Sequence, residues 1–234
     1  MTCVAIIPAR GGSKRIPGKN IRDFAGRPMI AHSITAALEC RLFDRVLVST
    51  DDPRIMEVAR AHGAEAPFTR PAAIADDTAT TDAVIQHALD WLEQHDTLPD
   101  QACCLYATAP FVRSDDLVRG LTILRQHHAT TAFSVTSFAY PIFRALKVRP
   151  DGFVEMFWPE NRTVRSQDLP EAWHDAGQFY WIDVARYRAA PRLFSDRSAP
   201  VPLPRHRVQD IDTEEDWRRA EVLHAVLAAG ESRS

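Results

Sequence analysis

The chain has 234 residues, of which 45% are hydrophobic and 25% charged, values typical of a folded globular protein with one substantial core. A net charge of −3 argues against general nucleic-acid binding, and no apolar stretch approaches the roughly 18 residues of a membrane span. We therefore expect neither a nucleic acid nor a membrane as partner. The short apolar start runs directly into charged residues, unlike a signal peptide, and the four cysteines form no C-x-x-C pair, so we expect a cytoplasmic protein with reduced thiols.

The most informative stretch runs from Val4 to Asn20. It begins as an apolar run typical of a strand buried on both faces and then changes to glycine, proline and positive charge. Glycine lets backbone N–H groups approach a ligand closely, and clustered cations favour an anion. The sequence therefore predicts a polyphosphate-binding loop at one edge of a sheet, with an ordinary solvated loop as the alternative. The cations and paired glycines are Arg10, Lys14, Arg15, Lys19, Gly11 and Gly12.

This loop matches neither of the two common phosphate-binding motifs. Five residues separate Gly12 from Gly18, and Asn20 rather than serine or threonine follows Lys19, so the stretch is not a Walker A loop. The G-x-G-x-x-G pattern of dinucleotide-binding folds does not occur either. The loop must therefore be interpreted from its own residues.

Strand and helix patterns alternate after the loop. Such alternation implies parallel strands with right-handed crossovers, and hence an open, Rossmann-like, mostly parallel α/β sheet that binds ligands at the carboxyl ends of its strands. Asp51 and Asp52 end the second strand, where we interpret them first as caps of the next helix. The expected helices are 28–40, 53–62, 78–94 and 117–127, and the expected strands are 46–49, 64–68, 102–107, 131–137 and 177–184.

Residues 7–20, IPARGGSKRIPGKN, resemble the signature loop of the CMP-sialic acid synthetase family, the cytidylyltransferases that activate nonulosonic acids. The similarity extends over nearly the whole chain, which would then be a single cytidylyltransferase domain, 1–234. It implies that Arg10 and Lys19 are catalytic cations. It also implies a nucleotide-binding set that includes Ala9, Arg10, Gly11, Gly12, Ser13, Lys14, Lys19, Asn20 and, after a later strand, Thr108.

The segment that follows Phe68 resembles the part of the family that contacts the cytosine base. Arg70 precedes a proline, and an Asp-Asp-Thr-Ala stretch follows, so the resemblance assigns Arg70, Ala79 and Thr81 to the base. The alternative is a polar loop in which Asp77 or Thr78 caps the next helix.

A second motif, Tyr-Ala-Thr-Ala-Pro at 106–110, begins at the end of the apolar run 102–107. Sialic acid members of the family have glutamine where this chain has Tyr106, and the tyrosine form resembles the branch that acts on pseudaminic acid. We therefore expect Tyr106 to contact the sugar, with a buried core tyrosine as the competing explanation.

The pattern changes again in residues 139–170. Apolar stretches at 143–148 and 153–158 flank a Pro- and Gly-containing turn at 149–152, which predicts a β-hairpin outside the main sheet. Exposed aromatic residues on such a hairpin would need covering, so we expect a homodimer. In the resembled family an insertion here is the dimerisation subdomain, and we expect it to help cover the partner's sugar site.

Residues 162–181 carry the remaining sugar-site candidates. A guanidinium suits bidentate capture of the carboxylate that every nonulosonic acid has, and Arg165 matches the family position with that role. A histidine beside an aspartate is also commonly a simple loop hydrogen bond. By resemblance the other candidates are Gln167, His174, Asp175, Gln178 and Tyr180.

Asp210 and Asp212 lie two residues apart before a helix expected at 213–227. On an extended backbone both carboxylates point to one face, and such hard oxygen ligands suit Mg²⁺, with Mn²⁺ as a substitute, carried with substrate phosphates. We predict both residues to be catalytic metal ligands. The alternative for Asp212 is helix capping, by itself or through Thr213, with Asp216 completing a capping box.

These motifs together predict an enzyme that transfers CMP from CTP to the anomeric hydroxyl of a nine-carbon sugar acid, of the pseudaminic type, and releases pyrophosphate. By resemblance the product would serve surface glycan biosynthesis. Three alternatives remain open: a sialic or legionaminic acid enzyme, the cytidylyltransferase for the eight-carbon acid KDO, and a non-catalytic nucleotide-binding module. The last would need the basic loop but not Asp210 and Asp212.

Overall fold

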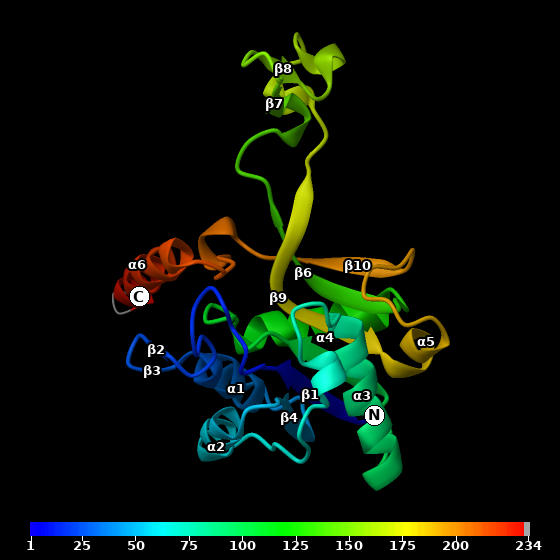
Figure 1. Ribbon diagram of the computed structural model, residues 1–234. Coiled ribbons are helices and arrows are strands. Elements are labelled where there is room, and N and C mark those ends of the chain that lie inside the picture. Colours follow the sequence, from blue (N-terminus) through cyan, green and yellow to red (C-terminus); the bar gives the residue numbers. More distant parts are fainter. Residues whose placement is uncertain (232–234) are drawn as a thin grey trace.

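The computed structural model describes residues 1–231 and contains a six-stranded sheet in the order β10-β6-β9-β5-β1-β4 (Figure 1). Its strands run parallel except β9, which is antiparallel to both β5 and β6. The predicted open, mostly parallel α/β sheet is therefore confirmed. The strands are β1 (Cys3–Pro8), β4 (Arg45–Ser49), β5 (Gln101–Leu105), β6 (Thr131–Ser137), β9 (Trp173–Asp183) and β10 (Ser198–Pro202).

Helices cover both faces of this sheet. Cys3, Ala5 and Ile7 of β1 pack toward α1 (Met29–Glu39), α2 (Pro53–Ala61) and α4 (Ser114–Gln126). Val4 and Ile6 pack toward α3 (Thr81–His95) and α5 (Val184–Ala189) on the opposite face. This burial of alternate side chains on both faces explains why β1 is apolar throughout. Among residues 1–231, no helix is both long and apolar enough to cross a lipid bilayer.

A third, smaller core attaches the C-terminal helix α6 (Glu214–Glu231) to the basic loop. Ile16 of the loop and Trp217 of α6 are both fully buried in this cluster, next to Phe24 of the short hairpin β2 (Asp23–Phe24) and β3 (Arg27–Pro28). The burial of Ile16 in this core thus anchors the middle of the basic loop, while the charged residues of the loop remain at the surface.

Two strand predictions differ from the structure. Residues 64–68 form only an isolated bridge at Glu65, and a second bridge lies just beyond them at Thr69; Pro67, which has no N–H to donate, lies between the two. The edge strand β10 was not predicted, since its sequence SAPVP contains two prolines. Proline is compatible with an edge strand when its nitrogen faces away from the neighbouring strand.

Residues between β6 and β9 leave the body as a projection (Figure 1). Its antiparallel strands β7 (Leu146–Val148) and β8 (Val154–Met156) confirm the predicted hairpin, closed by a turn in which Gly152 has a φ of 86° and its N–H donates to the Arg149 carbonyl. Both strands are shorter than predicted, and a 3₁₀ turn, η2 (Ile142–Arg144), takes up the first two residues of the first predicted strand. The 3₁₀ turns of the molecule are η1 (Ala72–Ile74), η2 (Ile142–Arg144), η3 (Pro159–Asn161), η4 (Ser166–Asp168) and η5 (Arg205–Arg207).

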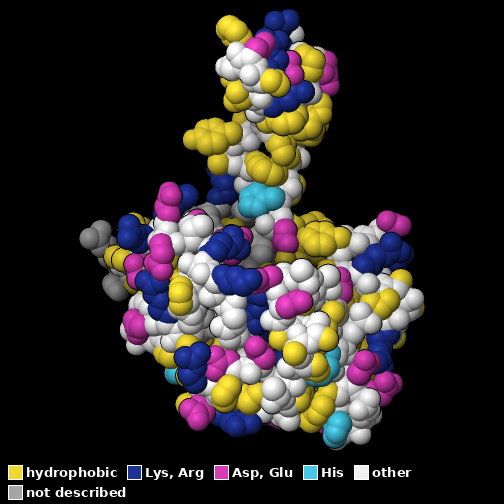
Figure 2. Space-filling model, in the orientation of Figure 1, with side chains coloured by type: hydrophobic (Ala, Val, Ile, Leu, Met, Phe, Trp, Pro, Cys, Tyr) yellow, Lys and Arg dark blue, Asp and Glu magenta, His cyan; other side chains and the backbone are white. Residues whose placement is uncertain are grey.

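The projection carries apolar side chains that its own chain leaves in solvent. Tyr140 is 84% exposed, Val148 73% and Phe153 68%, and hydrophobic atoms gather on the projection and its neck in Figure 2. Soluble monomers rarely expose contiguous apolar surface of this kind. The projection therefore has the character of an interaction surface.

Candidate active site

A cavity of about 500 Å³ opens at the carboxyl ends of β1 and β5, between the basic loop and residues 76–81. Ligand sites of open α/β sheets occupy this position. The cavity brings together residues that are far apart in the sequence. Predicted residues that line it are Arg10, Ser13, Lys14, Lys19, Asn20, Arg70, Ala79, Thr81, Tyr106, Thr108 and Asp212, joined by Arg15, Asp76 and Asp77; the predicted Ala9, Gly11 and Gly12 are outside this lining.

The two aspartates that follow β4, Asp51 and Asp52, have different roles. Asp52 caps α2 by accepting a hydrogen bond from the Arg54 N–H at 2.8 Å, as predicted. Asp51 instead accepts the Gly11 N–H at 2.9 Å and so holds the basic loop. A Cβ at Gly11 would lie 2.8 Å from the Asp52 side chain, which explains the glycine by close approach.

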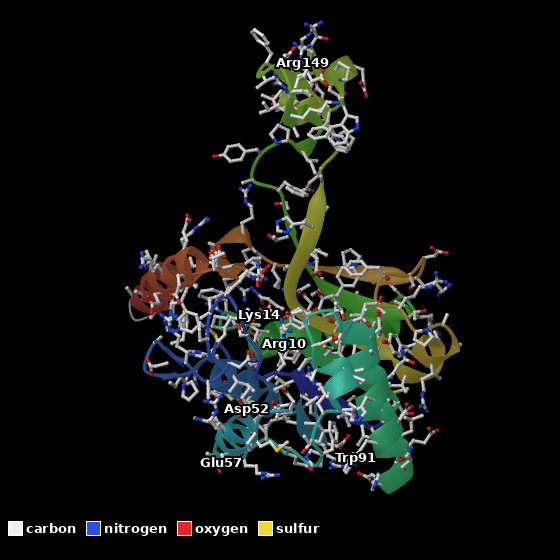
Figure 3. The ribbon with its side chains drawn as sticks, in the orientation of Figure 1. Arg10, Lys14, Asp52, Glu57, Trp91 and Arg149 are labelled. Carbon is white, nitrogen blue, oxygen red and sulfur yellow. The ribbon has the colours of Figure 1, made fainter. Side chains whose placement is uncertain are left out.

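Each of the four loop cations is paired with a carboxylate from the opposite side of the cavity. Arg10 Nη1 lies 2.5 Å from Asp77 Oδ1, and Lys14 binds the other oxygen of Asp77. Arg15 lies 2.9 Å and Lys19 3.4 Å from the two oxygens of Asp212. Figure 3 shows Arg10 and Lys14 beside each other at the foot of the projection. The cavity therefore holds four cationic side chains, each of which is already paired with a carboxylate of the protein.

Arg70 is buried at the base of the cavity, with 5% of its surface exposed. Its Nε donates to Ser49 Oγ at 3.1 Å and its guanidinium also donates to the Ser49 carbonyl. Burial lowers the pKa of Arg70, and the nearby Asp51 carboxylate opposes that effect. The side chain is thus rigidly oriented, as a group that reads a ligand edge needs to be.

The segment opposite the loop is shaped by Asp76. Its Oδ1 accepts the N–H groups of Thr78 at 2.9 Å and Ala79 at 2.8 Å. Thr80 then caps α3 by accepting the Ala83 N–H at 3.2 Å, so the alternative in which Asp77 or Thr78 caps this helix is wrong. The helix consequently begins three residues later than predicted.

Tyr106 links the cavity to strand β9. Its hydroxyl lies 2.9 Å from Thr81 Oγ1, and its ring centroid is 5.3 Å from that of Tyr180, whose hydroxyl donates to Asp175. Burial raises the pKa of Tyr106 to about 12, so the phenol stays protonated at neutral pH. The residue is half-buried and lines the cavity, and is therefore more than a core tyrosine.

The structure separates the two roles that the sequence left open for Asp212. Thr213 Oγ1 accepts the Asp216 N–H at 3.2 Å, and Asp216 accepts the Thr213 N–H at 2.9 Å, which completes a capping box without Asp212. The Asp212 carboxylate faces Arg15 and Lys19 instead. Capping therefore does not explain Asp212.

Asp210 and Asp212 offer two carboxylates of the kind that a hard divalent cation takes, although Asp210, unlike Asp212, lies outside the cavity lining. Asp210 is exposed at the surface; partial desolvation by the surrounding protein, and then the charge of Asp212, raise its pKa. A cation would relieve this concentration of negative charge. No cluster of three or more His, Cys, Asp or Glu side chains suited to a metal occurs within residues 1–231, so phosphate oxygens and water would have to supply the other ligands.

The remaining sugar-site candidates lie outside the cavity lining. Asp175 Oδ1 accepts the Gly177 N–H at 2.9 Å, next to the bulge of β9. His174 Nδ1 lies 2.9 Å from the Asp175 carbonyl, the loop hydrogen bond considered from the sequence. Gln178 is 3% exposed and donates to the Arg207 carbonyl at 2.6 Å, while its Oε1 has no partner among the described residues.

Arg165 and Gln167 lie on the projection, apart from the body that holds the cavity (Figure 1). The Arg165 Nε donates to Asp168 at 2.7 Å, and the side chain is 71% exposed. Within one chain the structure therefore does not bring Arg165 to the other predicted sugar-site residues.

Three residues near the site were not assigned to it from the sequence. Asp51 and Asp77 pair with groups that only the fold brings near them. Phe194 is 61% exposed and its ring lies 4.8 Å from Phe133 and 6.5 Å from Tyr180. Asp77 lies in the Asp-Asp-Thr-Ala stretch and Asp51 at the end of the second strand, but the sequence does not indicate the groups that they bind, and no pattern distinguishes Phe194.

An open α/β sheet with a cationic cavity at the carboxyl ends of its strands defines a nucleotide-binding protein of the doubly wound class. The chain belongs to the cytidylyltransferase family, whose model matches residues 4–189.

Similar proteins agree over the full length. A pseudaminic acid cytidylyltransferase of Campylobacter jejuni is 43% identical over 97% of this chain and 97% of its own. A CMP-N,N'-diacetyllegionaminic acid synthase of Legionella pneumophila is 32% identical over 95% and 96%. A solved CMP:2-keto-3-deoxy-manno-octonic acid synthetase complexed with CTP has a TM-score of 0.67 and 21% identity, covering 96% of this chain and 99% of that one, and so supports the fold.

Proposed function

We propose that the protein transfers CMP from CTP to the anomeric hydroxyl of pseudaminic acid and releases pyrophosphate. The observation that carries this proposal is the convergence of four loop cations and buried Arg70 on one cavity. Two Campylobacter jejuni relatives that bear the name pseudaminic acid cytidylyltransferase, 43% and 42% identical over 97% of the chain, support the choice of acid. The free and largely buried cysteines fit a reducing compartment, and we place the reaction in the cytoplasm.

The proposed step is a single displacement at phosphorus. The sugar hydroxyl attacks the α-phosphorus and gives up its proton to water, the bond from that phosphorus to the bridging oxygen breaks, and pyrophosphate carries away the electron pair. Negative charge grows on phosphate oxygens, so preorganised cations lower the barrier. Arg10, Lys14, Arg15 and Lys19 supply such charge on one side of the cavity. No covalent intermediate with the protein is required.

Asp210 and Asp212 would hold the Mg²⁺ that accompanies the triphosphate, or Mn²⁺ in its place. The cation would supply charge neutralisation at the phosphates. The two carboxylates then have the task of keeping a hard cation beside the loop, and Lys19, which donates to the Ile211 carbonyl at 2.5 Å, fixes the backbone between them.

Base selection is proposed for Arg70 with Ala79 and Thr81. These residues line the cavity together, and the rigid guanidinium can donate to the O2 and N3 acceptors of cytosine, whereas uracil presents an N–H at N3. We expect turnover with CTP to exceed that with UTP, ATP and GTP. Equal turnover with UTP would remove the assignment of Arg70 to the base.

A panel of acids tests the acceptor. Purified protein with Mg²⁺ and CTP is given pseudaminic, legionaminic, sialic or eight-carbon acid, and release of pyrophosphate and formation of the CMP-sugar are measured. We expect pseudaminic acid to react fastest. Faster turnover of another acid would reassign the substrate, and binding of CTP without pyrophosphate release with any acid would favour a non-catalytic module.

We further propose that the protein acts as a homodimer through residues 139–170. The support is the exposed apolar surface of the projection and the position of Arg165 away from its own cavity. In a two-fold dimer the projection of one subunit can lie over the cavity of the other. Arg165 would then bind the sugar carboxylate in its partner's site.

A further inference from the structure

Asp77 joins two opposite walls of the cavity. It belongs to the segment before α3, and its two carboxylate oxygens bind Arg10 and Lys14 of the basic loop, the first at 2.5 Å. All three side chains reach solvent, with exposures of 34% for Arg10, 81% for Lys14 and 40% for Asp77. The Asp77 carboxylate is therefore paired with two cations that face the cavity.

The backbone of this segment is shaped by other side chains. Asp76 accepts the N–H groups of Thr78 and Ala79, and Thr80 caps the helix. The hydrogen bonds found for Asp77 go to Lys14 and Arg10, and these bonds lower its pKa, so it is ionised at neutral pH. Its contribution is thus a negative charge placed on two cations.

We infer that Asp77 is a competing anion that occupies Arg10 and Lys14 when the cavity is free of nucleotide and yields them to incoming phosphate. This inference rests on the proposed function, which puts phosphate groups against the same cations. Binding of CTP then becomes an exchange of one anion for another. By the same exchange Asp77 returns to the cations as pyrophosphate leaves, which weakens pyrophosphate binding and favours product release.

The test replaces the charge while keeping the shape. Dissociation constants of CTP, inorganic pyrophosphate and cytidine are measured by calorimetry for the parent and Asp77→Asn at low ionic strength. Exposed ion pairs contribute little each, so losing two should tighten CTP and pyrophosphate binding by about three- to tenfold. Cytidine, which has no phosphate, should bind within about twofold of the parent, because a structural effect would move all three ligands.

Two variants serve as controls. Glu57→Gln makes the same charge change on α2, away from Arg10 and Lys14 (Figure 3), and should leave all three constants unchanged. Asp77→Glu keeps a carboxylate and should restore the weaker pyrophosphate binding of the parent. In steady-state kinetics, Asp77→Asn should also show a pyrophosphate inhibition constant lower by the same factor.

Unchanged or weaker pyrophosphate binding in Asp77→Asn, with a melting temperature near the parent's, would overturn the inference. If that variant does not fold, Asp77→Ser is measured against the same criterion. A parent protein that binds neither CTP nor pyrophosphate would instead overturn the proposed function, and the inference with it.

Discussion

Asp212 and Asp216 are close in the sequence, but their contacts give the two carboxylates different roles. Asp216 completes the cap of α6 with Thr213, whereas Asp212 faces Arg15 and Lys19 in the cavity. Their separation makes the metal proposal testable, because stability and turnover now depend on different residues.

We expect Asp210→Asn and Asp212→Asn to fold normally and to lose about 100- to 1000-fold in kcat, since each removes a charged ligand while keeping its size. Excess Mg²⁺ or Mn²⁺ should rescue Asp210→Asn only in part. The matched control is Thr213→Ala, which should cost about 1 kcal/mol of stability with a modest effect on rate. Near-parental turnover of Asp210→Asn at limiting Mg²⁺ would remove it from the metal site.

His32 predicts a pH dependence of stability. It is 4% exposed, its Nε2 contacts the Phe24 carbonyl at 2.9 Å, and burial together with the charge of Arg27 lowers its pKa to about 4. The unfolded chain, with a histidine pKa near 6.5, therefore binds more protons between those values. Stability should be full above about pH 6.5 and fall by about 1 to 3 kcal/mol as the pH decreases toward 4.

Urea unfolding at pH 7.5 and 4.5, at one protein concentration, measures this dependence. His32→Gln should show a smaller loss between the two pH values, because glutamine does not titrate. An equal loss in both proteins would assign the acid sensitivity to other groups.

At the scale of elements, the sequence predicted those strands whose pattern is local. The apolar run of β1 and the β-branched run of β6 identify them without any partner. β10 forms only because it pairs with β6, since its two prolines would otherwise argue against a strand. β9 extends to Trp173 because it pairs with β6 up to Ser137. Such pairing over long sequence separation leaves no local signal.

The candidate site follows the same division. Residues that belong to a sequence motif, such as Arg10, Lys19 and Tyr106, line the cavity. Asp51 was interpreted first as a capping residue, and capping was the alternative considered for Asp77, because aspartate commonly caps helices, yet both hold the basic loop. Their partners lie 40 and 67 positions away, so only the folded chain shows the contacts.

The packing of α4 on β9 makes a prediction at Gly120. A Cβ there would lie 2.7 Å from Trp181 and 2.9 Å from Phe179, both fully buried. Gly120→Ala should destabilise the protein by about 1 to 3 kcal/mol in spite of alanine's better helix propensity. Val118→Ala on the exposed side of the same helix should stay within about 0.5 kcal/mol. Equal stabilities by urea unfolding would show that the two layers can separate at little cost.

For the whole molecule, two valines with the same 63% exposure test the proposed dimer. Val154 lies on the hairpin of the projection and Val226 on α6. Val154→Glu should produce monomers in sedimentation at micromolar concentration, because it places a charge in an apolar interface, while Val226→Glu should remain dimeric. A dimeric Val154→Glu would place the interface elsewhere.

Mixed dimers test whether one subunit completes the site of the other. Arg165→Ala should raise KM for the sugar acid and leave KM for CTP nearly unchanged. Mixing it with Asp210→Asn under subunit exchange should recover about a quarter of parental sites at low acid concentration, since half of the dimers then contain one intact composite site. No recovery in demonstrated heterodimers would mean that Arg165 serves its own subunit.

The prolines of β10 have a consequence for the free rim of the sheet. Leu203 donates its N–H to Val135 on β6, and N–H groups of alternate residues face the same side, so the nitrogens of Pro200 and Pro202 face outward. That rim therefore offers few donors to a strand arriving from another molecule, which is the contact that starts amyloid-like stacking. The edge of the sheet at β10 is in this way protected from aggregation, in a protein whose projection exposes apolar side chains.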